Sequence, residues 1–400
     1  MRTLVRRGLY ALGLIIGAAA IAAFIYREEL ERLYRVNTLF DEDVIVGNFS
    51  NMGSMFHSKV IPRSGPVFAF GSAPRPLPER FTGPSGDQST EAFLKRTSTT
   101  SLLVIRDDAI EFEEYYQGTS PEDLRISWSV AKSFLAAMLG IAVGEGAIAS
   151  LDEPADKYAP MLKGSAYEGV SLRNIAMMAS GVEFNEDYLD YDSDINKMGR
   201  ALALNGSLDE FSASITAKAG PPGEAWRYVS IDTHVLSMAI RGATGKSMTD
   251  YMAEKIWSKI GAEADALYLT DTPGAEFVLG GLNMRTRDYA RFGRVILNGG
   301  VLDGVEVAPP DFLAEATTDI APPPDTPARR RGHGYGYQFW LPDNPDGEVY
   351  FSGVYGQSMF VDQKAGVIIV KTSADRNFRE NNSRNLLDMI ALFRAIARGG

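Results

Sequence analysis

A serine and a lysine spaced three residues apart could carry out chemistry in this sequence: Ser129 precedes Lys132 in the stretch 126–134. The uncharged segment 134–143 behind them predicts a buried helix, and residues three apart on a helix lie on one face. The lysine amine could reach the serine hydroxyl and, if burial lowers its pKa, remove the proton to make a nucleophile. The spacing fits equally well an ordinary core helix that Ser127 or Ser129 caps at its N-terminus.

A tyrosine and another serine stand about a hundred residues further on, in the stretch 221–230. Its Pro-Pro-Gly start predicts a tight turn, which would place Tyr228 and Ser230 in a short loop before another helix. Tyr228 could exchange protons with the nucleophile if the ammonium of Lys132 lowers the phenol pKa from ~10. Packing explains a tyrosine at this position equally well.

A glycine-bearing stretch towards the C-terminal end, 352–360, is the third candidate. Gly353 and Gly356 would let a substrate carbonyl approach a strand closely. The backbone N–H groups of Gln357 and Ser129 could then stabilise the negative oxygen that forms when a serine attacks a carbonyl. The alternative is that the two glycines only shape a hairpin.

Composition narrows the functional classes. The 400 residues suggest two or three structural units, and the net charge of −11 argues against a nucleic-acid partner. The basic run 329–331 stands beside prolines and is interpreted as a solvated loop. The absence of cysteine excludes disulfides, thiolate metal sites and cysteine nucleophiles. The histidines His57, His234 and His333 are far apart, and the sequence has no zinc-binding or nucleophile-elbow motif, so no metal or cofactor is expected.

The N-terminal segment predicts a single membrane-spanning anchor. Three arginines in residues 1–7 precede 8–26, nineteen residues without charge, which as a helix would span about 28 Å of the ~30 Å hydrocarbon core. The arginines place residues 1–7 in the cytoplasm and the catalytic part on the periplasmic or extracellular side of the inner membrane. The alternative is a signal peptide cleaved near Ala20 or Ala23, which would release a secreted protein.

Hydrophobic patterning predicts strands at both ends of the body and helices between them. Strands are expected at 101–106 and 109–116, as a hairpin, and at 335–341, 349–352, 358–361 and 367–372. Helices are expected at 27–35, at 172–179 behind a Ser171 cap, at 289–297 and at 382–398. Residues 36–95 predict an extended arm with little regular structure. The acidic loop 185–194 is either solvated surface or faces a substrate.

This order of elements predicts an α/β (α+β) fold, in which an antiparallel sheet is flanked by helices and carries an inserted all-helical domain. The predicted parts are a cytoplasmic tip, a transmembrane anchor, a juxtamembrane helix with the extended arm, a catalytic domain in two pieces, and the helical domain. Their residues are, in that order, 1–7, 8–26, 27–95, 96–150 with 276–400, and 151–275.

Taken together, the three motifs resemble those of the serine β-lactamase and penicillin-binding-protein superfamily. The order matches: Ser129-x-x-Lys132, then Tyr228-x-Ser230, then a glycine-bearing strand motif, with support from 170–173, 179–182 and 280–281. The resemblance covers roughly residues 95–400 and looks closest to the class C-like branch of esterases and 6-aminohexanoate-dimer hydrolases. It implies a β-lactamase/transpeptidase-like fold.

Two departures from the family pattern bear on the substrate. The usual Tyr-x-Asn is Tyr-x-Ser here, and the usual Lys-Thr-Gly or His-x-Gly is Tyr355-Gly356-Gln357. In the family that lysine helps to hold a substrate carboxylate. Its replacement by Tyr355 predicts weak recognition of antibiotic-like anions, unless another cation such as Arg227 substitutes for it. The tyrosine ring would also narrow the cleft and favour slim acyl groups.

The residues and the resemblance together predict a membrane-anchored serine hydrolase of small esters or amides that forms an acyl-enzyme on Ser129. Lys132 and Tyr228 would share the proton, and the amides of Ser129 and Gln357 would form the oxyanion hole. The residues expected to contact substrate are Trp128, Tyr188, Ser230, Tyr355 and Gly356. The alternatives are a receptor that binds cell-wall peptides or β-lactams, and a true β-lactamase or D,D-peptidase. The oligomeric state is left open.

Overall fold

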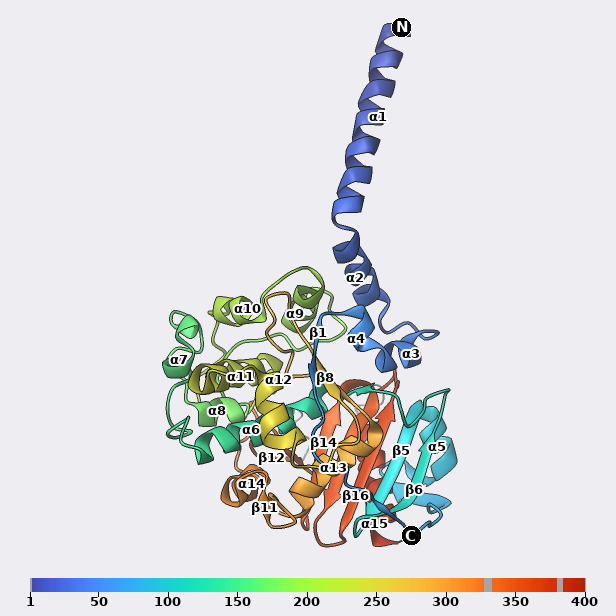
Figure 1. Cartoon of the computed structure of the whole chain (residues 1–400), viewed down its shortest axis with the longest axis vertical. Helices are drawn as coiled ribbons and strands as arrows, with labels where there is room; N and C mark the ends of the chain where they lie inside the picture. Colours follow the sequence, from blue (N-terminus) through green and yellow to red (C-terminus); the bar gives the residue numbers. More distant parts are fainter. Residues whose placement is uncertain (1, 327–332, 380–383, 400) are drawn as a thin grey trace.

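The computed structural model describes residues 2–326, 333–379 and 384–399, and its centre is an eight-stranded sheet (Figure 1). In spatial order the strands are β12 (Gly334–Tyr335), β13 (Trp340–Leu341), β14 (Glu348–Gly353), β15 (Gln357–Asp362), β16 (Val367–Ser373), β5 (Thr99–Arg106), β6 (Ala109–Tyr115) and β2 (Gly71–Ser72). All neighbours are antiparallel except β2 and β6. Strands from both ends of the body meet where β16 pairs with β5.

Both faces of this sheet are covered, because apolar residues stand at consecutive positions of its central strands. In β5, Leu102 and Val104 face a cluster to which one pair of helices contributes. Leu103 and Ile105 face the main core, to which a second pair of helices contributes. The first pair of helices is α5 (Thr90–Arg96) and α15 (Arg384–Arg398), and the second is α6 (Ala131–Gly144) and α13 (Thr286–Leu297). The sheet is therefore a middle layer that can present its strand ends to a site.

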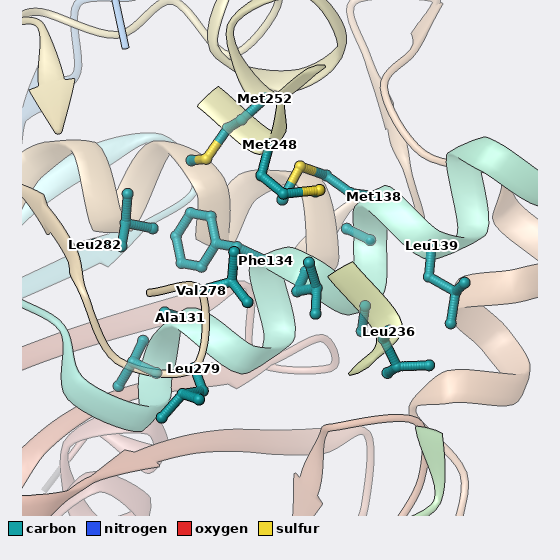
Figure 2. Packing of buried hydrophobic residues seen from close by; sticks show 14 of the residues in the cluster. Ala131, Phe134, Met138, Leu139, Leu236, Met248, Met252, Val278, Leu279 and Leu282 are labelled. Atoms are coloured by element: carbon teal, nitrogen blue, oxygen red, sulfur yellow. The ribbon is translucent and has the colours of Figure 1, made fainter. Parts of the chain in front are cut away.

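Helix α6 lies in the main core and begins directly after the candidate serine. Its side chains from Ala131 to Ala142 are buried, and Phe134 stacks on Phe292 of α13 with ring centroids 3.7 Å apart. Figure 2 shows Phe134 and Met138 among apolar side chains from other segments, including Met248. A helix that is buried all round is fixed by packing on every side, so its first turn is held in place.

The structure contradicts the expectation that Ser127 or Ser129 caps this helix. A short 3₁₀ helix, η1 (Trp128–Val130), precedes α6, and neither helix has a side-chain cap. The Ser127 hydroxyl donates to the carbonyl oxygen of Trp128 at 3.0 Å, and the Ser129 hydroxyl accepts from Lys132. Ser129 is therefore available for chemistry rather than occupied by capping.

Helices from the middle of the chain gather beside the main sheet (Figure 1). They are α7 (Ala155–Tyr158), α8 (Leu172–Ala176), α9 (Asp194–Ala203), α10 (Leu208–Ser214), α11 (Ser230–Thr244) and α12 (Met248–Met252), with a short 3₁₀ helix, η2 (Pro160–Leu162), and a short π-helix, η3 (Ala253–Trp257). The Ser171 hydroxyl accepts the backbone N–H of Asn174 at 3.2 Å, which confirms it as the cap of α8.

The segment predicted to be all-helical also contains a strand, because β8 joins a second sheet. That sheet is β1 (Ser58–Ile61), β8 (Ala266–Leu269), β9 (Leu282–Met284) and β7 (Arg125–Ile126).

The N-terminal helix α1 (Arg2–Ile25) projects away from the body in Figure 1, and α2 (Arg27–Thr38) follows it. The segment Arg6–Ile25 has a mean hydropathy of 2.2 and no part of it is buried, so by length and composition it could cross a membrane. A signal sequence near the N-terminus has the same features, so this helix is compatible with either predicted role. Helix α2 confirms the charged helix expected at 27–35.

Residues 36–95 contain more regular structure than the sequence indicated. They form α3 (Ile45–Ser50), α4 (Met52–Met55), strand β1, helix α5, and the hairpin of β3 (Arg80–Gly83) and β4 (Gly86–Ser89). The prediction of little regular structure was wrong because some of this order comes from distant partners. Strand β1 pairs with β8, and Phe49 and Met52 are buried in the main core.

The predicted C-terminal strands match the structure with one exception. The run 335–341 forms two short strands, and Gln338 between them has a left-handed backbone with φ 61°. The remaining elements are β10 (Val301–Leu302), β11 (Val305–Glu306), α14 (Pro310–Ala316) and the turn η5 (Val354–Gly356). The arginine run 329–331 lies outside the described residues.

Candidate active site

Ser129 and Lys132 meet at the start of α6, as their spacing predicted. The Lys132 side-chain nitrogen lies 3.1 Å from the Ser129 hydroxyl oxygen and 2.8 Å from the carbonyl oxygen of Leu279. Trp128, the residue before the serine, has a φ of 44°. This left-handed conformation is costly for a bulky residue and occurs mainly where surrounding structure enforces it, as at functional sites.

Burial gives Lys132 the pKa that a general base needs. Lys132 is only 2 % exposed to solvent. Removing the ammonium from water lowers the pKa of Lys132 to about 7, against the opposing effect of the negative charge of Glu186. A lysine that titrates near neutrality is uncharged in a large fraction of molecules and can accept the Ser129 proton.

Tyr228 lies close to Lys132. The lysine nitrogen is 5.3 Å from the centre of the Tyr228 ring, which stacks on Trp340 at 5.8 Å. Burial and then the charge of Glu186 raise the pKa of the Tyr228 phenol, although hydrogen bonds to serine side chains, including that of Ser129, act against them. The expectation that Lys132 lowers this pKa was therefore wrong. Tyr228 keeps its proton at neutral pH and can relay it, while Lys132 is the group that can accept one.

The end of strand β14 passes directly against the serine backbone. A side chain at Gly353 would bring its Cβ within 2.7 Å of the carbonyl oxygen of Ser127 and 3.2 Å of the backbone nitrogen of Ser129, so glycine is required there. Gly353 pairs with Gln357 at the start of β15. The glycine thus does more than shape a hairpin, because it lets the sheet edge reach the nucleophile.

Gln357 is held in place by its own side chain. Its amide nitrogen donates to the carbonyl oxygen of Ser373 at 2.7 Å, and the backbone N–H of Ser373 donates to its amide oxygen at 3.1 Å. The preceding turn contains two left-handed residues, Tyr355 (φ 61°) and Gly356 (φ 83°). Gln357 and Ser129 line the same cavity, where two fixed backbone N–H groups could act on one oxyanion.

Glu186, which the sequence did not single out, holds two of the predicted substrate-contacting residues. The backbone N–H of Ser230 donates to its carboxylate at 2.9 Å, the Ser230 hydroxyl donates to its other oxygen, and the Tyr188 hydroxyl donates at 2.6 Å. The acidic loop 185–194 therefore turns inward at this residue. Its run of acidic residues concealed this, because such a run usually marks solvated surface.

Lys371 is a second buried lysine that sequence reasoning missed. It lies on β16, donates to the Ser373 hydroxyl, and approaches the carbonyl oxygen of Gly356 at 3.5 Å. Burial lowers the pKa of Lys371 to about 8, while the negative charge of Asp375 acts in the opposite direction. A lone lysine in an otherwise apolar and hydroxyl-bearing strand was the available signal. Arg227, the substitute cation that the sequence suggested, is instead paired with an aspartate at 2.7 Å.

Ser129 lies between two cavities. One cavity, of about 210 Å³, is lined by Tyr228, Gln357 and several charged side chains, and we term it the polar cavity. The other, of about 300 Å³, is lined mainly by apolar side chains, and we term it the apolar cavity. Every residue predicted for catalysis or substrate contact lies at or beside this junction: Trp128, Ser129, Lys132, Tyr188, Tyr228, Ser230, Tyr355, Gly356 and Gln357.

The histidines take no part in this junction. His234 lies buried on α11 with its ring nitrogen 2.8 Å from a carboxylate oxygen of Asp209, and no histidine lines either cavity. In the described parts of the chain, no three His, Cys, Asp or Glu side chains are grouped so that they could hold a metal ion.

Comparisons with known sequences point to one family. The sequence model of the family described as Beta-lactamase matches residues 87–392. The 6-aminohexanoate-dimer hydrolase of Paenarthrobacter ureafaciens is 31 % identical over 299 residues, which cover 71 % of this chain and 74 % of that protein.

Solved structures show the same fold. A candidate 6-aminohexanoate-dimer hydrolase from Bacillus anthracis superimposes with a TM-score of 0.79 at 24 % identity, over 90 % of this chain and 95 % of that one. A penicillin-binding protein from Bacillus halodurans superimposes with a TM-score of 0.57 at 14 % identity, over 76 % of this chain and 99 % of that one. The predicted β-lactamase/transpeptidase-like architecture is therefore confirmed.

Proposed function

This chain belongs to the Beta-lactamase family and is a serine hydrolase, and we propose that it cleaves esters or amides through an acyl-enzyme on Ser129. The observation that carries the proposal is the hydrogen bond between Lys132 and the Ser129 hydroxyl, made by a lysine whose pKa is about 7. A serine beside an amine that is uncharged in a large fraction of molecules is an activated nucleophile. The proposal therefore gives Ser129 the role of nucleophile and Lys132 the role of base.

In the proposed acylation step, Lys132 takes the hydroxyl proton while the Ser129 oxygen bonds to the substrate's carbonyl carbon. The carbonyl oxygen gains a negative charge, which the backbone N–H groups of Ser129 and Gln357 stabilise. The bond to the leaving oxygen or nitrogen then breaks, and Tyr228 gives that atom a proton and regains one from Lys132. The products are an acyl ester of Ser129 and a free alcohol or amine.

In the proposed deacylation step, water replaces the leaving group. Lys132, again neutral, removes a proton from the water through Tyr228 while the water oxygen attacks the ester carbon. The Ser129 oxygen leaves with a proton, and a carboxylic acid is released. The raised pKa of Tyr228 supports its role as a relay, because a relay must hold a proton that it can give.

Linear esters and amides are the substrate class that we favour. The relative from Paenarthrobacter ureafaciens is named for the hydrolysis of 6-aminohexanoate dimer, whose units are joined by an amide bond. A second candidate, a β-lactamase or D,D-peptidase, has one observation in its favour: Lys371 places a cation in the polar cavity, where a substrate carboxylate could lie.

Two measurements test the proposal. Intact-mass spectrometry after treatment with a fluorophosphonate should show one adduct, and peptide mapping should place it on Ser129. Multiple turnover of p-nitrophenyl acetate should then distinguish a hydrolase from a receptor that is acylated once. An unlabelled Ser129, or a single stoichiometric release of nitrophenol, would contradict the proposal.

The finer location of the protein is also a proposal. We propose that 8–26 remains as an anchor, with 1–7 in the cytoplasm and the catalytic body on the periplasmic side. Three arginines before an unburied apolar helix support this topology. The expected result is a protein that sediments with membranes and retains its N-terminus. A soluble form that begins near Ala20 or Ala23 would show cleavage instead.

A further inference from the structure

We propose that the apolar cavity binds the hydrocarbon chain of the substrate's acyl group, so that the protein acts on medium- to long-chain amphiphiles. The inference rests on the proposed function, because it takes Ser129 as the nucleophile at the cavity wall. It keeps the expectation of slim acyl groups and adds a preference for long ones. Tyr355 does not close the cleft: its ring stacks on Phe40 at 4.5 Å and forms part of the cavity wall.

The lining of the apolar cavity fits a hydrocarbon chain. Apolar side chains dominate it, and the chief ones are Leu39, Phe40, Phe56, Ile195, Phe277 and Leu279. Among the described lining residues only Arg200 is charged. Its guanidinium donates to the carbonyl oxygen of Tyr191 at 2.7 Å and lies over the ring of the same tyrosine. A volume of about 300 Å³ is at the small end for ligand pockets and suits one slender chain.

The position of Tyr228 assigns the chain to the acyl side of the scissile bond. Tyr228 lines the polar cavity and not the apolar cavity, whereas Ser129 lines both. In the proposed mechanism Tyr228 delivers a proton to the leaving group, so the leaving group occupies the polar cavity. The remaining side of the carbonyl, the acyl chain, then extends into the apolar cavity.

The mouth of the apolar cavity lies towards the end from which α1 projects. Leu189 and Tyr191 line the cavity and are nevertheless 83 % and 60 % exposed. Val36, in the last turn of α2, and Leu39, directly after that helix, form another part of the lining. Helix α2 is fixed against the end of α9, where Arg32 donates to the carbonyl oxygen of Ala203 at 3.2 Å, and Figure 1 shows both helices at that end. A chain could therefore enter from the bilayer or from water.

The first test is the dependence of kcat/KM on acyl length, with full-length protein in phosphatidylcholine vesicles and p-nitrophenyl acetate, butyrate, octanoate and decanoate. Each methylene buried should raise kcat/KM by about fourfold, which corresponds to ~0.8 kcal/mol. We expect a total rise of at least ~10²-fold from acetate to decanoate. A flat or falling series would overturn the proposal while leaving ester hydrolysis by Ser129 intact.

The second test fills the cavity. Gly199 lines it from α9, and a Cβ there would meet no atom within 4 Å, so Gly199→Phe can place a ring in the cavity without a backbone clash. We expect decanoate hydrolysis to fall at least ~10-fold and acetate hydrolysis to change less than twofold. Gly47→Phe is the matched control, because Gly47 is equally uncrowded but lies outside both cavities. Equal losses for acetate and decanoate would overturn the proposal.

A binding measurement separates this proposal from the catalytic one. If no ester is hydrolysed, the proposed function fails, but calorimetry with decanol still tests the cavity: binding that is lost in Gly199→Phe supports it, and no binding overturns it. Comparing the decanoyl ester as a monomer in water with the same ester embedded in the vesicles identifies the source of the chain. Faster turnover of the embedded ester assigns the bilayer, and faster turnover of the monomer assigns free amphiphiles.

Discussion

The polar and apolar cavities share Ser129 but are built from different parts of the chain. The lining of the polar cavity lies entirely within residues 87–392, the part that matches the Beta-lactamase family. The apolar cavity takes one wall from residues 36–56, which precede that match. In the proposed function, the proton chemistry therefore lies in the part that matches the family model, and a segment before that match adds a wall to the cavity proposed for the acyl chain.

The largest expected effect removes the group that both cavities share. Ser129→Ala should lower kcat/KM for every ester by at least ~10³-fold, because the acyl-enzyme cannot form. Decanol binding should persist, since the substitution removes only one oxygen from the wall of the apolar cavity. Steady-state kinetics and calorimetry on the same preparation check both statements. Residual activity within about tenfold of the parent would show that another group is the nucleophile.

Tyr228→Phe acts on the polar cavity alone. We expect kcat to fall by about 10²-fold, the usual contribution of a positioned acid–base group, and by the same factor for acetate and decanoate. The chain-length series measured on this variant therefore sharpens the comparison. A loss that grows with acyl length would mean that Tyr228 contacts the chain, and an unchanged kcat would make it a packing residue.

The family core was also the part that the sequence predicted best. Ser129 and Lys132 are neighbours through local helix spacing, and β5 with β6 is a hairpin around a two-residue turn, so nearby residues determine both. The cap predicted at Ser127 or Ser129 failed because the chain enters α6 through the η1 turn, where the Ser129 hydroxyl accepts a hydrogen bond from Lys132. Sequence patterning describes short-range geometry well, and these motifs depend on it.

The wall that residues 36–56 add to the apolar cavity could not be predicted, because long-range packing creates it. Phe40 is an unremarkable residue of a Gly- and Pro-containing segment until Tyr355 stacks on it across more than three hundred positions of sequence. Glu186 resembles its acidic neighbours until Ser230 and Tyr188 donate to it. Lys371 could not be recognised from its strand alone, because its ammonium approaches the carbonyl oxygen of Gly356, which lies in the turn before the neighbouring strand β15.

The pH dependence tests the base of the polar cavity. Burial lowers the pKa of Lys132 to about 7, and the neutral amine is the active form. kcat/KM should therefore fall about tenfold per pH unit below that value and level off above it, for acetate and decanoate alike. Lys132→Arg should abolish this limb together with the activity, because a guanidinium stays protonated. A profile that stays flat down to pH 5 would exclude Lys132 as the base.

Glu186→Gln should shift the acidic limb of the pH profile, in which kcat/KM falls as Lys132 becomes protonated, to lower pH. The negative charge of Glu186 raises the pKa of Lys132, so a neutral amide of the same shape lowers it and extends activity into more acidic solution. We expect kcat at pH 8 to change less than tenfold. Asp192→Asn, in the same acidic loop but exposed, is the control and should leave the profile unchanged. An unshifted limb in Glu186→Gln would leave this residue a positioning role only.

The smallest expected effect concerns anionic substrates in the polar cavity. The wild-type protein should hydrolyse nitrocefin with a lower kcat/KM than p-nitrophenyl butyrate, because the sequence pattern predicts Tyr355 at the position of the family's carboxylate-binding lysine. Lys371 remains as a possible substitute: its pKa of about 8 keeps it mostly protonated at pH 7. Its ammonium is partly engaged, however, since it donates to the Ser373 hydroxyl and lies near the negative charge of Asp375.

Lys371→Met keeps the length of the side chain and removes its charge. A hydrogen bond to a charged group contributes ~1.5–3 kcal/mol, but an engaged ammonium offers less, so we expect nitrocefin turnover to fall about tenfold and butyrate turnover to change less than twofold. Lys364→Met, an exposed lysine on the turn between β15 and β16, should alter neither rate. Equal losses for both substrates would show that Lys371 only supports the fold. Nitrocefin turnover as efficient as that of butyrate in the parent protein would place this chain among the β-lactamases and make the polar cavity, rather than the apolar one, the determinant of its substrate.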